Sequence, residues 1–526
     1  MTTHEESRAA LARAMRAGGF WTDQVIDVLL GRAVAQSPGW TAIVAHRADL
    51  EGVRRISYRD LEALVARAAG GLRALGVARG DVVSVQLPNW WEFVVATLAC
   101  GRLGAVVNPL MPIFRERELL YMLRFSEARV FIVPRAYRGH DHAAMAQGMR
   151  AQLPALRRIV VVDDDGPDGF ERVLLRHDDV IPPPDSVSSA ALRPDDLAVL
   201  MFTSGTTGEP KGVMHSCNTL IACLNSLAGR LKLTQDDVLL VGSPVGHMMG
   251  FAAHVLLSLR LGATMVLQDV WEARRAAVLM GSEGVTFSGG ATPFLTDVCD
   301  AVASGVPRPE RLRLFLCAGA PIPPVLIERA KRELGLTVCS LWGMTEALSG
   351  TLTEPERAAE NSSRTDGRPL EGMEVKVVDE GGRTLPTGQT GRLMVRGAQV
   401  LLGYFKRPDL PTTDAEGWFD SGDLAFLDAE GYIRISGRSK DVLIRGDRKV
   451  ERPASVALVV GSENRCGDRG RLLRSLRRHS LPRNDQRGGG DFRPLPAKRD
   501  SHAACRASET APRSRGAELR GVCDSR

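Results

Sequence analysis

The sequence lacks the usual marks of a secreted, disulfide-bonded or membrane-spanning protein. None of its nine cysteines forms a CxxC pair, so the sequence indicates neither a zinc site nor a disulfide framework. Residues 1–15 are polar and mixed in charge, without the apolar core that a secretory signal needs. The most apolar stretch, residues 93–114, contains Arg102, Asn108 and Pro109, which predicts a buried helix followed by a strand and not a membrane span. A reducing cytoplasm fits these absences best.

The C-terminal tail lacks what a packed domain needs. Residues 445–526 carry 20 Lys and Arg against 10 Asp and Glu, whereas the first 444 residues carry 48 against 52. Beyond Gly461 the tail is rich in Arg, Gly and Pro and nearly free of aromatics, so it cannot bury enough apolar surface to offset its ordering entropy. We expect a degenerate or disordered region. The alternative is a basic arm that binds nucleic acid or anionic lipid, but no binding motif supports it, and no nucleic-acid partner is expected.

Before the tail, apolar runs and helical patterns alternate, which predicts an α/β multidomain protein. Continuous apolar runs separated by helices are typical of a parallel sheet buried on both faces. A second unit of this βαβ type begins near Leu197 and runs past "SLWGMTE". From about Glu371, short alternating strands with Gly-rich turns predict a small β-barrel or an antiparallel sheet. In the first unit the expected strands lie at residues 81–87, 105–110, 129–134 and 157–164.

The segment "TSGTTGEPKG", residues 203–212, follows an apolar run directly. Its backbone N–H groups and hydroxyls are good phosphate donors, and its glycines permit the positive φ angles of an anion-binding nest. The Walker A pattern requires adjacent Gly and Lys, whereas here Glu209 and Pro210 separate Gly208 from Lys211. The segment therefore predicts a phosphate-binding loop of another kind.

Four further motifs follow in order: "SPVGHMMGF", "CAGAPIP", "LWGMTE" and "GWFDSGDLAFLDAEGYIRISGRSKD". Together with the glycine-threonine loop, they resemble the adenylate-forming superfamily of acyl-CoA synthetases, peptide-synthetase adenylation domains and luciferases, over roughly residues 20–446. The N-terminal half is similar to bacterial short- and medium-chain or alicyclic acyl-CoA ligases, of the cyclohexanecarboxylate–CoA ligase kind.

The resemblance implies how ATP would be bound. The loop would hold the β- and γ-phosphates, "CAGAPIP" would line the adenine, and Asp423 would accept hydrogen bonds from both ribose hydroxyls. Arg438 would contact ribose or phosphate. The family usually has Tyr where this chain has Trp342, so the adenine contacts there can differ. The implied nucleotide-binding set is Thr203, Ser204, Gly205, Thr206, Thr207, Gly208, Lys211, Gly319, Ala320, Pro321, Trp342, Gly343, Met344, Thr345, Asp423 and Arg438.

The resemblance also implies a catalytic set. Thr345 would bond the α-phosphate and Glu346 would ligate Mg²⁺, because attack by a carboxylate on a triphosphate needs the repelling charges neutralised by a hard cation. Lys211 would add a positive charge, and His247 would gate the carboxylate pocket. A His within an apolar run is on its own more often a core residue.

Small residues are expected to leave room for the acyl group. The pocket residues implied by the resemblance are His247, Ser288, Gly289, Gly290 and Ala291. No Lys or Asp there meets an amino-acid ammonium group, which favours a hydrophobic carboxylate.

We therefore predict an ATP-dependent carboxylic acid–CoA ligase that uses ATP, Mg²⁺ and coenzyme A. It would form an acyl-adenylate and then an acyl-CoA thioester from a short- or medium-chain or alicyclic acid. Two alternatives remain: an adenylating enzyme that loads a carrier protein, and a nucleotide and carboxylate binder with little catalysis. The oligomeric state is left open.

The expected domains follow from these patterns. An AMP-binding domain, residues 1–437, would contain subdomains at about 20–190, 191–365 and 366–437. Residues 438–446 would form the hinge, with Lys440 at its pivot, and 447–526 the aberrant basic tail.

The tail departs from the family after Gly446. Only Lys449 and Lys498 lie beyond Lys440, and neither has the Gly-Lys context of the family's catalytic lysine. A frameshift near codon 446 is our hypothesis for this departure, which would leave a chain that binds ATP but adenylates slowly.

Overall fold

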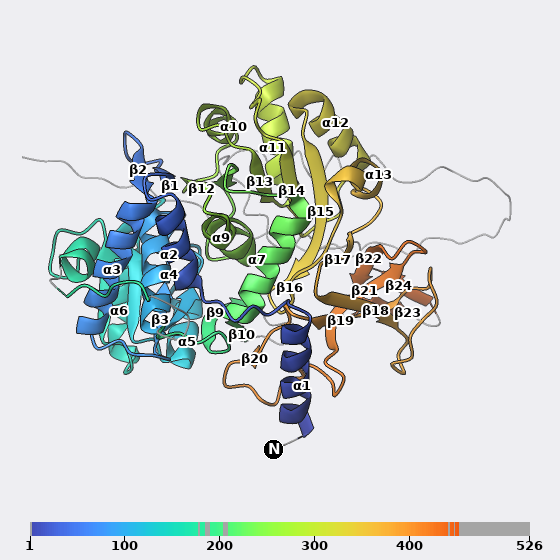
Figure 1. Ribbon diagram of the computed structural model, residues 1–526, viewed down its shortest axis with the longest axis horizontal. Helices are drawn as coiled ribbons and strands as arrows, with labels where there is room; N and C mark the ends of the chain where they lie inside the picture. The colour runs from blue at the N-terminus through green and yellow to red at the C-terminus, as the bar shows by residue number, and fades with distance from the viewer. Residues whose placement is uncertain are drawn as a thin grey trace, which may run out of the picture. The chain divides into compact units, whose positions relative to one another are not determined.

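The computed structural model describes residues 3–176, 179–184, 190–203, 209–439, 442–445 and 448–451, which all belong to one compact unit, Met1–Ser462 (Figure 1). Three predictions lie outside the described residues: the loop positions Ser204–Gly208, the hinge residue Lys440, and nearly all of the basic tail. Within the tail only a short strand, β24, is described; it spans Arg448–Glu451 and pairs with β23, Val442–Arg445.

A seven-stranded sheet contains the four strands expected in the first half of the chain. These four and β9 run parallel to one another, whereas β10 and β20 are antiparallel additions at one edge. Continuous apolar runs form these strands because both faces of the sheet are buried. In spatial order the strands are β20 (Gly403–Tyr404), β10 (Lys211–Ser216), β9 (Leu197–Thr203), β4 (Val106–Pro109), β3 (Val82–Val85), β5 (Val130–Pro134) and β8 (Arg158–Val162).

A nine-stranded sheet is built in the same way. Its six central strands, from β15 to β1, are parallel, and antiparallel strands close both edges. In spatial order the strands are β17 (Arg368–Pro369), β16 (Leu348–Leu352), β15 (Thr337–Met344), β14 (Leu314–Ala318), β13 (Phe287–Gly290), β11 (Val238–Val241), β12 (Thr264–Gln268), β1 (Thr41–His46) and β2 (Arg54–Ser57).

The two large sheets exchange strands. β1 and β2 come from the first part of the chain but join the nine-stranded sheet, whereas β9 and β10 follow residue 190 and join the seven-stranded sheet. The sheets therefore do not follow the predicted subdomain limits, because strand partners far apart in sequence leave no local pattern.

Helices cover both faces of each large sheet (Figure 1). Side chains alternate along β5: Val130 and Ile132 pack in the core shared with α3 and α4, whereas Phe131 and Val133 pack against α5 and α6. The helices are α1 (Thr3–Ala17), α2 (Ile26–Gln36), α3 (Tyr58–Ala74), α4 (Trp91–Leu103), α5 (Glu116–Ser126), α6 (His142–Met149), α7 (Cys217–Leu231), α8 (Met248–Gly250), α9 (Leu257–Leu261), α10 (Ala273–Ser282), α11 (Thr292–Ala303), α12 (Pro324–Leu334) and α13 (Ala358–Asn361).

A four-stranded antiparallel sheet follows the second unit. It contains β18 (Met373–Val378), β19 (Gly391–Gly397), β21 (Phe419–Leu427) and β22 (Ile433–Arg438), in that spatial order. Of the two alternatives, the antiparallel sheet is confirmed and the small β-barrel is not, since β18 and β22 are edge strands that do not pair with each other among the described residues. Strand alternation predicts a half-buried sheet but does not determine whether its edges meet.

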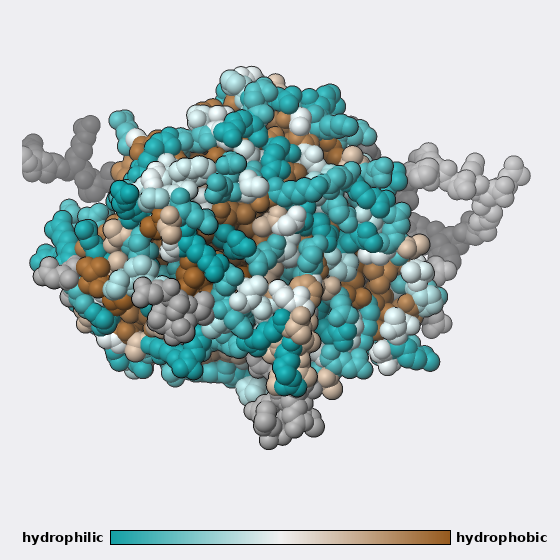
Figure 2. Space-filling view, viewed as in Figure 1, coloured by the Kyte–Doolittle hydropathy of each residue, from teal (hydrophilic) through white to brown (hydrophobic). Residues whose placement is uncertain are grey.

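The surface is mostly polar. Figure 2 shows hydrophilic residues over most of one face, with hydrophobic residues visible in several separate places. Within the described ranges, no helix combines the length and the apolar character that crossing a membrane requires.

Candidate active site

Four adjacent parallel strands bring most of the predicted site residues to one edge of the nine-stranded sheet. β11, β13, β14 and β15 are neighbours in this sheet, and at their carboxyl ends lie three of the motifs, "SPVGHMMGF", "CAGAPIP" and "LWGMTE", and the expected acyl-pocket residues Ser288–Ala291. Ser243 to His247 follow β11, Gly290 ends β13, Gly319 follows β14, and Thr345 follows β15. In open α/β sheets, ligands bind beyond the carboxyl ends of the strands.

The glycine-threonine loop connects two strands of the other large sheet. Thr203 ends β9 and Lys211 begins β10, and the two residues are paired across this antiparallel hairpin. A Walker A loop instead joins a strand to a helix. The ammonium group of Lys211 lies 5.1 Å from the centre of the Tyr404 ring, within the range of a cation–π contact.

Tyr404 connects this hairpin to Glu346. Tyr404 is paired with Val213 of β10, and its hydroxyl donates a 3.0 Å hydrogen bond to Oε1 of Glu346. Glu346 is 9% exposed. Burial raises the pKa of Glu346, while the Tyr404 hydroxyl and the positive charge of Lys211 act to lower it.

His215 supports the turn that carries Thr345. Its Nε2 donates a 2.7 Å hydrogen bond to the backbone carbonyl of Thr345, and its Nδ1 lies 3.1 Å from the hydroxyl of Thr219. Burial lowers the pKa of His215 to about 4, so the ring is neutral at pH 7. A neutral ring that donates through Nε2 can accept through Nδ1, which matches both contacts.

Asp423 lies in the four-stranded sheet and is contacted from two sides. Trp342 donates a 2.9 Å hydrogen bond from Nε1 to Oδ2 of Asp423, and Nε of Arg438 lies 3.1 Å from Oδ1. Asp423 and Arg438 are paired directly across β21 and β22. The charge of Arg438 also acts to lower the pKa of Glu346, so the two carboxylates share one electrostatic environment.

The "CAGAPIP" segment is an open turn at the end of β14. Gly319 has φ +84° and is exposed, with no atom within 4 Å of the place where a Cβ would lie. Pro321 is also exposed, whereas Ala320 is half-buried. Gly343 and Met344, at the end of the neighbouring strand, are exposed and half-buried respectively. A flat base can approach such a segment without side-chain obstruction.

His247 precedes the short helix α8. Its Nδ1 accepts a 3.2 Å hydrogen bond from the backbone N–H of Met249. The side chain is accessible to solvent, yet protein atoms surround it closely enough to lower its pKa by desolvation. A pKa below the ordinary 6.5 leaves the ring mostly neutral at pH 7.

Neighbouring atoms pack closely against Gly289 and Gly290, and the acyl pocket expected beside them stays a prediction. A Cβ on Gly289 would lie 2.9 Å from the carbonyl oxygen of Leu316, and one on Gly290 would lie 3.0 Å from the Phe294 ring. The absence of side chains at these two glycines allows the close packing of β13. Ser288 is buried and donates to Leu240, and Ala291 caps α11.

The comparison with known proteins decides the family. A family model described as AMP-binding enzyme matches residues 30–405. The chain belongs to the AMP-binding enzyme family.

This AMP-binding enzyme resembles ligases over most of its length. It is 34% identical over 453 residues to the medium-chain fatty-acid–CoA ligase of Escherichia coli (strain K12), covering 86% of this chain and 78% of that ligase. It is 30% identical over 447 residues to the salicyl-AMP ligase / salicyl-S-ArCP synthetase of Mycobacterium tuberculosis, covering 84% and 77%.

Among solved structures, the inhibitor-bound N-terminal domain of FACL13 from Mycobacterium tuberculosis matches with a TM-score of 0.70 and 26% identity, covering 79% of this chain and 100% of that one. The predicted α/β fold and the predicted class, an ATP-dependent acid–CoA ligase that uses ATP, Mg²⁺ and coenzyme A, are confirmed by the family and these relatives.

Glu346 suits the way Mg²⁺ binds beside phosphates. No group of three or more His, Cys, Asp or Glu side chains able to hold a metal occurs in the part of the AMP-binding enzyme that the structure describes. Mg²⁺ usually keeps several waters and takes one or two carboxylates together with substrate phosphates. A single buried carboxylate, with one oxygen held by Tyr404, fits that mode and does not fit an all-protein cage.

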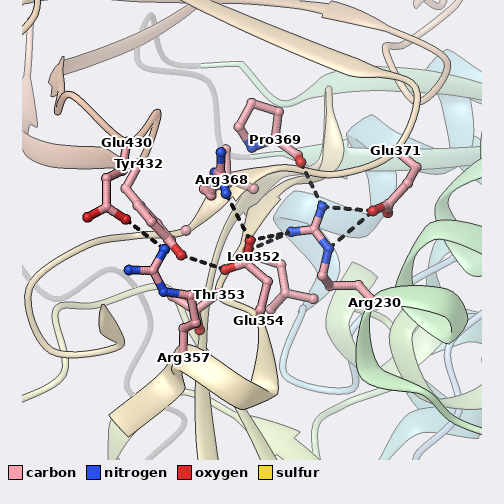
Figure 3. Close-up of polar contacts among 12 residues, drawn as sticks. Arg230, Leu352, Thr353, Glu354, Arg357, Arg368, Pro369, Glu371, Glu430 and Tyr432 are labelled. Atoms are coloured by element: carbon pink, nitrogen blue, oxygen red, sulfur yellow. Dashed lines mark hydrogen bonds and ion pairs between the residues drawn. The ribbon is translucent and has the colours of Figure 1, made fainter. Parts of the chain in front are cut away.

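A polar network joins the four-stranded sheet to the nine-stranded sheet of the AMP-binding enzyme (Figure 3). The Arg230 guanidinium, from α7, donates to the carbonyls of Leu352 and Pro369 at 3.0 and 2.9 Å. The hydroxyl of Tyr432, in the turn before β22, donates a 2.8 Å hydrogen bond to Glu354, just beyond β16. The network therefore connects the turn before β22 to the segment that follows β16.

Sequence reasoning missed Tyr404 and His215. Both lie between the recognised motifs, and the sequence around neither residue shows a spacing that predicts its role. "GYF" directly after an apolar pair, and a His within "GVMHS" just past the loop, were the only local signals.

Proposed function

We propose that this AMP-binding enzyme activates a hydrophobic, medium-chain or alicyclic carboxylate and transfers it to coenzyme A in the cytoplasm. The proposal is supported by the similarity to a medium-chain fatty-acid–CoA ligase and by the neutral His247. No Asp or Glu lies among Ser288–Ala291 to bind an amino-acid ammonium group.

One observation carries the assignment of the nucleotide site. Tyr404 contacts both Lys211 and Glu346, and Arg438, paired with Asp423, acts electrostatically on the same Glu346. The buried Glu346 carboxylate is thus contacted by Tyr404 of the seven-stranded sheet and influenced by the charge of Arg438 of the four-stranded sheet. Positive charges near the triphosphate and an acceptor for the ribose are the groups that this substrate requires.

We assign the residues the following roles. Thr203, Lys211 and the loop between them hold the β- and γ-phosphates, and Thr345 bonds the α-phosphate. Glu346 would hold Mg²⁺, which offsets charge on the phosphates when bound. Asp423 holds the ribose.

The reaction proceeds in two displacements. A carboxylate oxygen of the acid attacks the α-phosphorus, and the bond to the bridging oxygen breaks to release pyrophosphate. The thiolate sulfur of coenzyme A then attacks the acyl carbon, and AMP leaves with the electron pair of the broken C–O bond. Both steps depend mainly on positioning and charge stabilisation.

Carboxylate-dependent exchange of pyrophosphate into ATP tests the proposal. Short, medium-chain, alicyclic and aromatic acids and amino acids are compared, and thioester formation is then followed with coenzyme A. We expect exchange with medium-chain or alicyclic acids and its loss in Glu346→Gln. Exchange specific to an amino acid, or thioester formed only on a carrier protein, contradicts the proposal.

Two other functions have specific support. Transfer to a carrier protein is favoured by the similarity to a salicyl-S-ArCP synthetase. Slow adenylation is favoured by the presence of only Lys449 and Lys498 beyond Lys440. In that case ATP binds normally while exchange stays far below that of the Escherichia coli relative, and another reading frame of the gene past codon 446 encodes a domain with a Gly-Lys motif.

A further inference from the structure

We propose that Trp342 is a positioning residue that orients Asp423 for the ribose and keeps it ionised, and that Gly350 makes room for it to do so. The inference rests on the proposed function of Asp423 as the ribose acceptor. It goes further by assigning a role to the indole that replaces the tyrosine expected from the family resemblance.

The contacts of Asp423 with Trp342 and with Arg438 differ in their exposure to solvent. Trp342 is 7% exposed and Asp423 5%, so the bond from Nε1 to Oδ2 lies inside the protein. The side chain of Arg438 is 59% exposed, so its contact with Oδ1 is open to solvent and can be exchanged. An arriving diol can therefore displace Arg438, whereas Trp342 stays in place.

The backbone near Asp423 supports the same orientation. The N–H of Asp423 donates a 3.1 Å hydrogen bond to the hydroxyl of Ser421, which itself donates to the carbonyl of Leu393. Main chain and carboxylate are thus each held before a ligand binds. A carboxylate has about four acceptor positions, so one held by Trp342 leaves enough for two hydroxyls.

Gly350 is necessary for the position of the indole. A Cβ on Gly350 would lie 2.4 Å from the ζ3 carbon of Trp342, far inside van der Waals contact. Gly350 lies on β16, where its neighbour Thr351 pairs with Trp342 across the antiparallel ladder. The wide indole occupies the space that any side chain at position 350 would fill.

The hydrogen bond also acts on the charge of Asp423. Burial raises the pKa of Asp423, and the Trp342 N–H and the Arg438 charge lower it. Loss of the indole N–H would remove one of the contacts that lower the pKa of Asp423, so burial would raise that pKa further. Asp423 would then protonate at a higher pH and lose an acceptor.

The test compares Trp342→Phe with the unchanged full-length chain in steady-state exchange assays with ATP, 2′-deoxy-ATP and 3′-deoxy-ATP. We expect KM for ATP to rise about tenfold, the effect of losing one hydrogen bond to a charged group, with kcat changed less than about twofold. The preference for ATP over the deoxy analogues should shrink, and the acidic limb of kcat/KM should move to higher pH.

Trp271→Phe is the matched control. Trp271 donates a 2.8 Å hydrogen bond to Asp297 and packs on Gly242 as Trp342 does on Gly350. Its loss should leave KM for ATP, ribose discrimination and the pH profile unchanged. If Trp342→Phe only lowers thermal stability, as a merely structural residue would, the inference is wrong.

Two further variants separate the possible failures. Gly350→Ala keeps the indole but displaces its ring, and it should reproduce the KM and pH changes even if Trp342→Phe does not fold. When Gly350→Ala is combined with Trp342→Phe, the added methyl group should raise KM for ATP less, because the smaller phenyl ring leaves room for it. Asp423→Asn tests the underlying proposal. If this variant has an unchanged KM for ATP, the ribose site itself is overturned. If its KM rises while Trp342→Phe and Gly350→Ala behave like the unchanged chain, only the role of Trp342 is overturned.

Discussion

The Tyr404 hydroxyl lies 3.0 Å from Oε1 of Glu346, and this hydrogen bond connects an edge strand of the seven-stranded sheet to the turn after β15 of the nine-stranded sheet. The same tyrosine ring lies beneath the Lys211 ammonium group. Tyr404 therefore holds together the two charged groups that we assign to the triphosphate.

Tyr404→Phe should weaken adenylation without unfolding the protein. The hydroxyl lowers the pKa of Glu346 against the effect of burial, so its loss raises that pKa and protonates Glu346 at a higher pH. We expect kcat/KM for ATP to fall about tenfold and its acidic limb to shift upward. Tyr432→Phe, which removes a 2.8 Å bond to Glu354 outside the site, is the control and should show neither change.

Glu346→Gln should abolish most activity while the site keeps its shape. The amide oxygen can still accept the Tyr404 hydroxyl, but it carries no charge to hold a divalent cation. Exchange activity is expected to fall on the order of a hundredfold or more, and the Mg²⁺ concentration for half-maximal rate should rise. An unaltered Mg²⁺ dependence would count against Glu346 as the metal ligand.

Acid should destabilise the fold through two buried histidines. Burial lowers the pKa of His215 and of His254 to about 4, below the ordinary value of 6.5. Between those values the unfolded chain binds protons that the folded chain does not. Each histidine therefore makes the free energy of unfolding fall by about 1.4 kcal/mol for each pH unit of acidification. Denaturant titrations at pH 4.5 to 6.5 measure this slope, and His254→Phe should reduce it; an unchanged slope would mean that His254 does not contribute.

Replacing the buried Arg102 should lower the free energy of unfolding more than replacing a half-exposed arginine. Its side chain is 1% exposed, and its guanidinium nitrogens lie 2.6 Å from Oδ1 of Asp27 and 2.5 Å from Oε1 of Glu62. Arg102→Met leaves two carboxylates without their counter-charge and should lower the free energy of unfolding by about 3–5 kcal/mol. Arg73→Met breaks an ion pair with Asp179 in which the arginine is half exposed, and it should cost no more than about 1 kcal/mol. Equal losses in chemical denaturation would contradict the difference in burial.

The sequence predicts secondary structure correctly where a single run of residues determines it. The apolar runs near Val83, Val107 and Ile132 became parallel strands because burial on both faces demands continuous hydrophobicity. The pairing of β1 with β12 across more than two hundred residues has no such signature. Alternation likewise left open whether the four-stranded sheet closes into a barrel.

The site was predictable where chemistry and motif coincide. Glu346 and Asp423 are predicted as site residues because carboxylates are needed at those points and the motifs mark them, and their roles stay a prediction. The partners that orient these two carboxylates, Tyr404 and the Trp342 indole N–H, depend on which strands become neighbours. The packing that fills the space at Gly289 depends on Leu316, a residue of the adjacent strand.

The proposed contacts for the phosphates, the metal and the ribose belong to three separately hydrogen-bonded sheets, which contribute Lys211, Glu346 and Asp423. A nucleotide that touches all three is a noncovalent cross-link between segments that are far apart in the sequence. Occupancy should therefore make unfolding more cooperative as well as raising the melting temperature with the logarithm of ATP concentration.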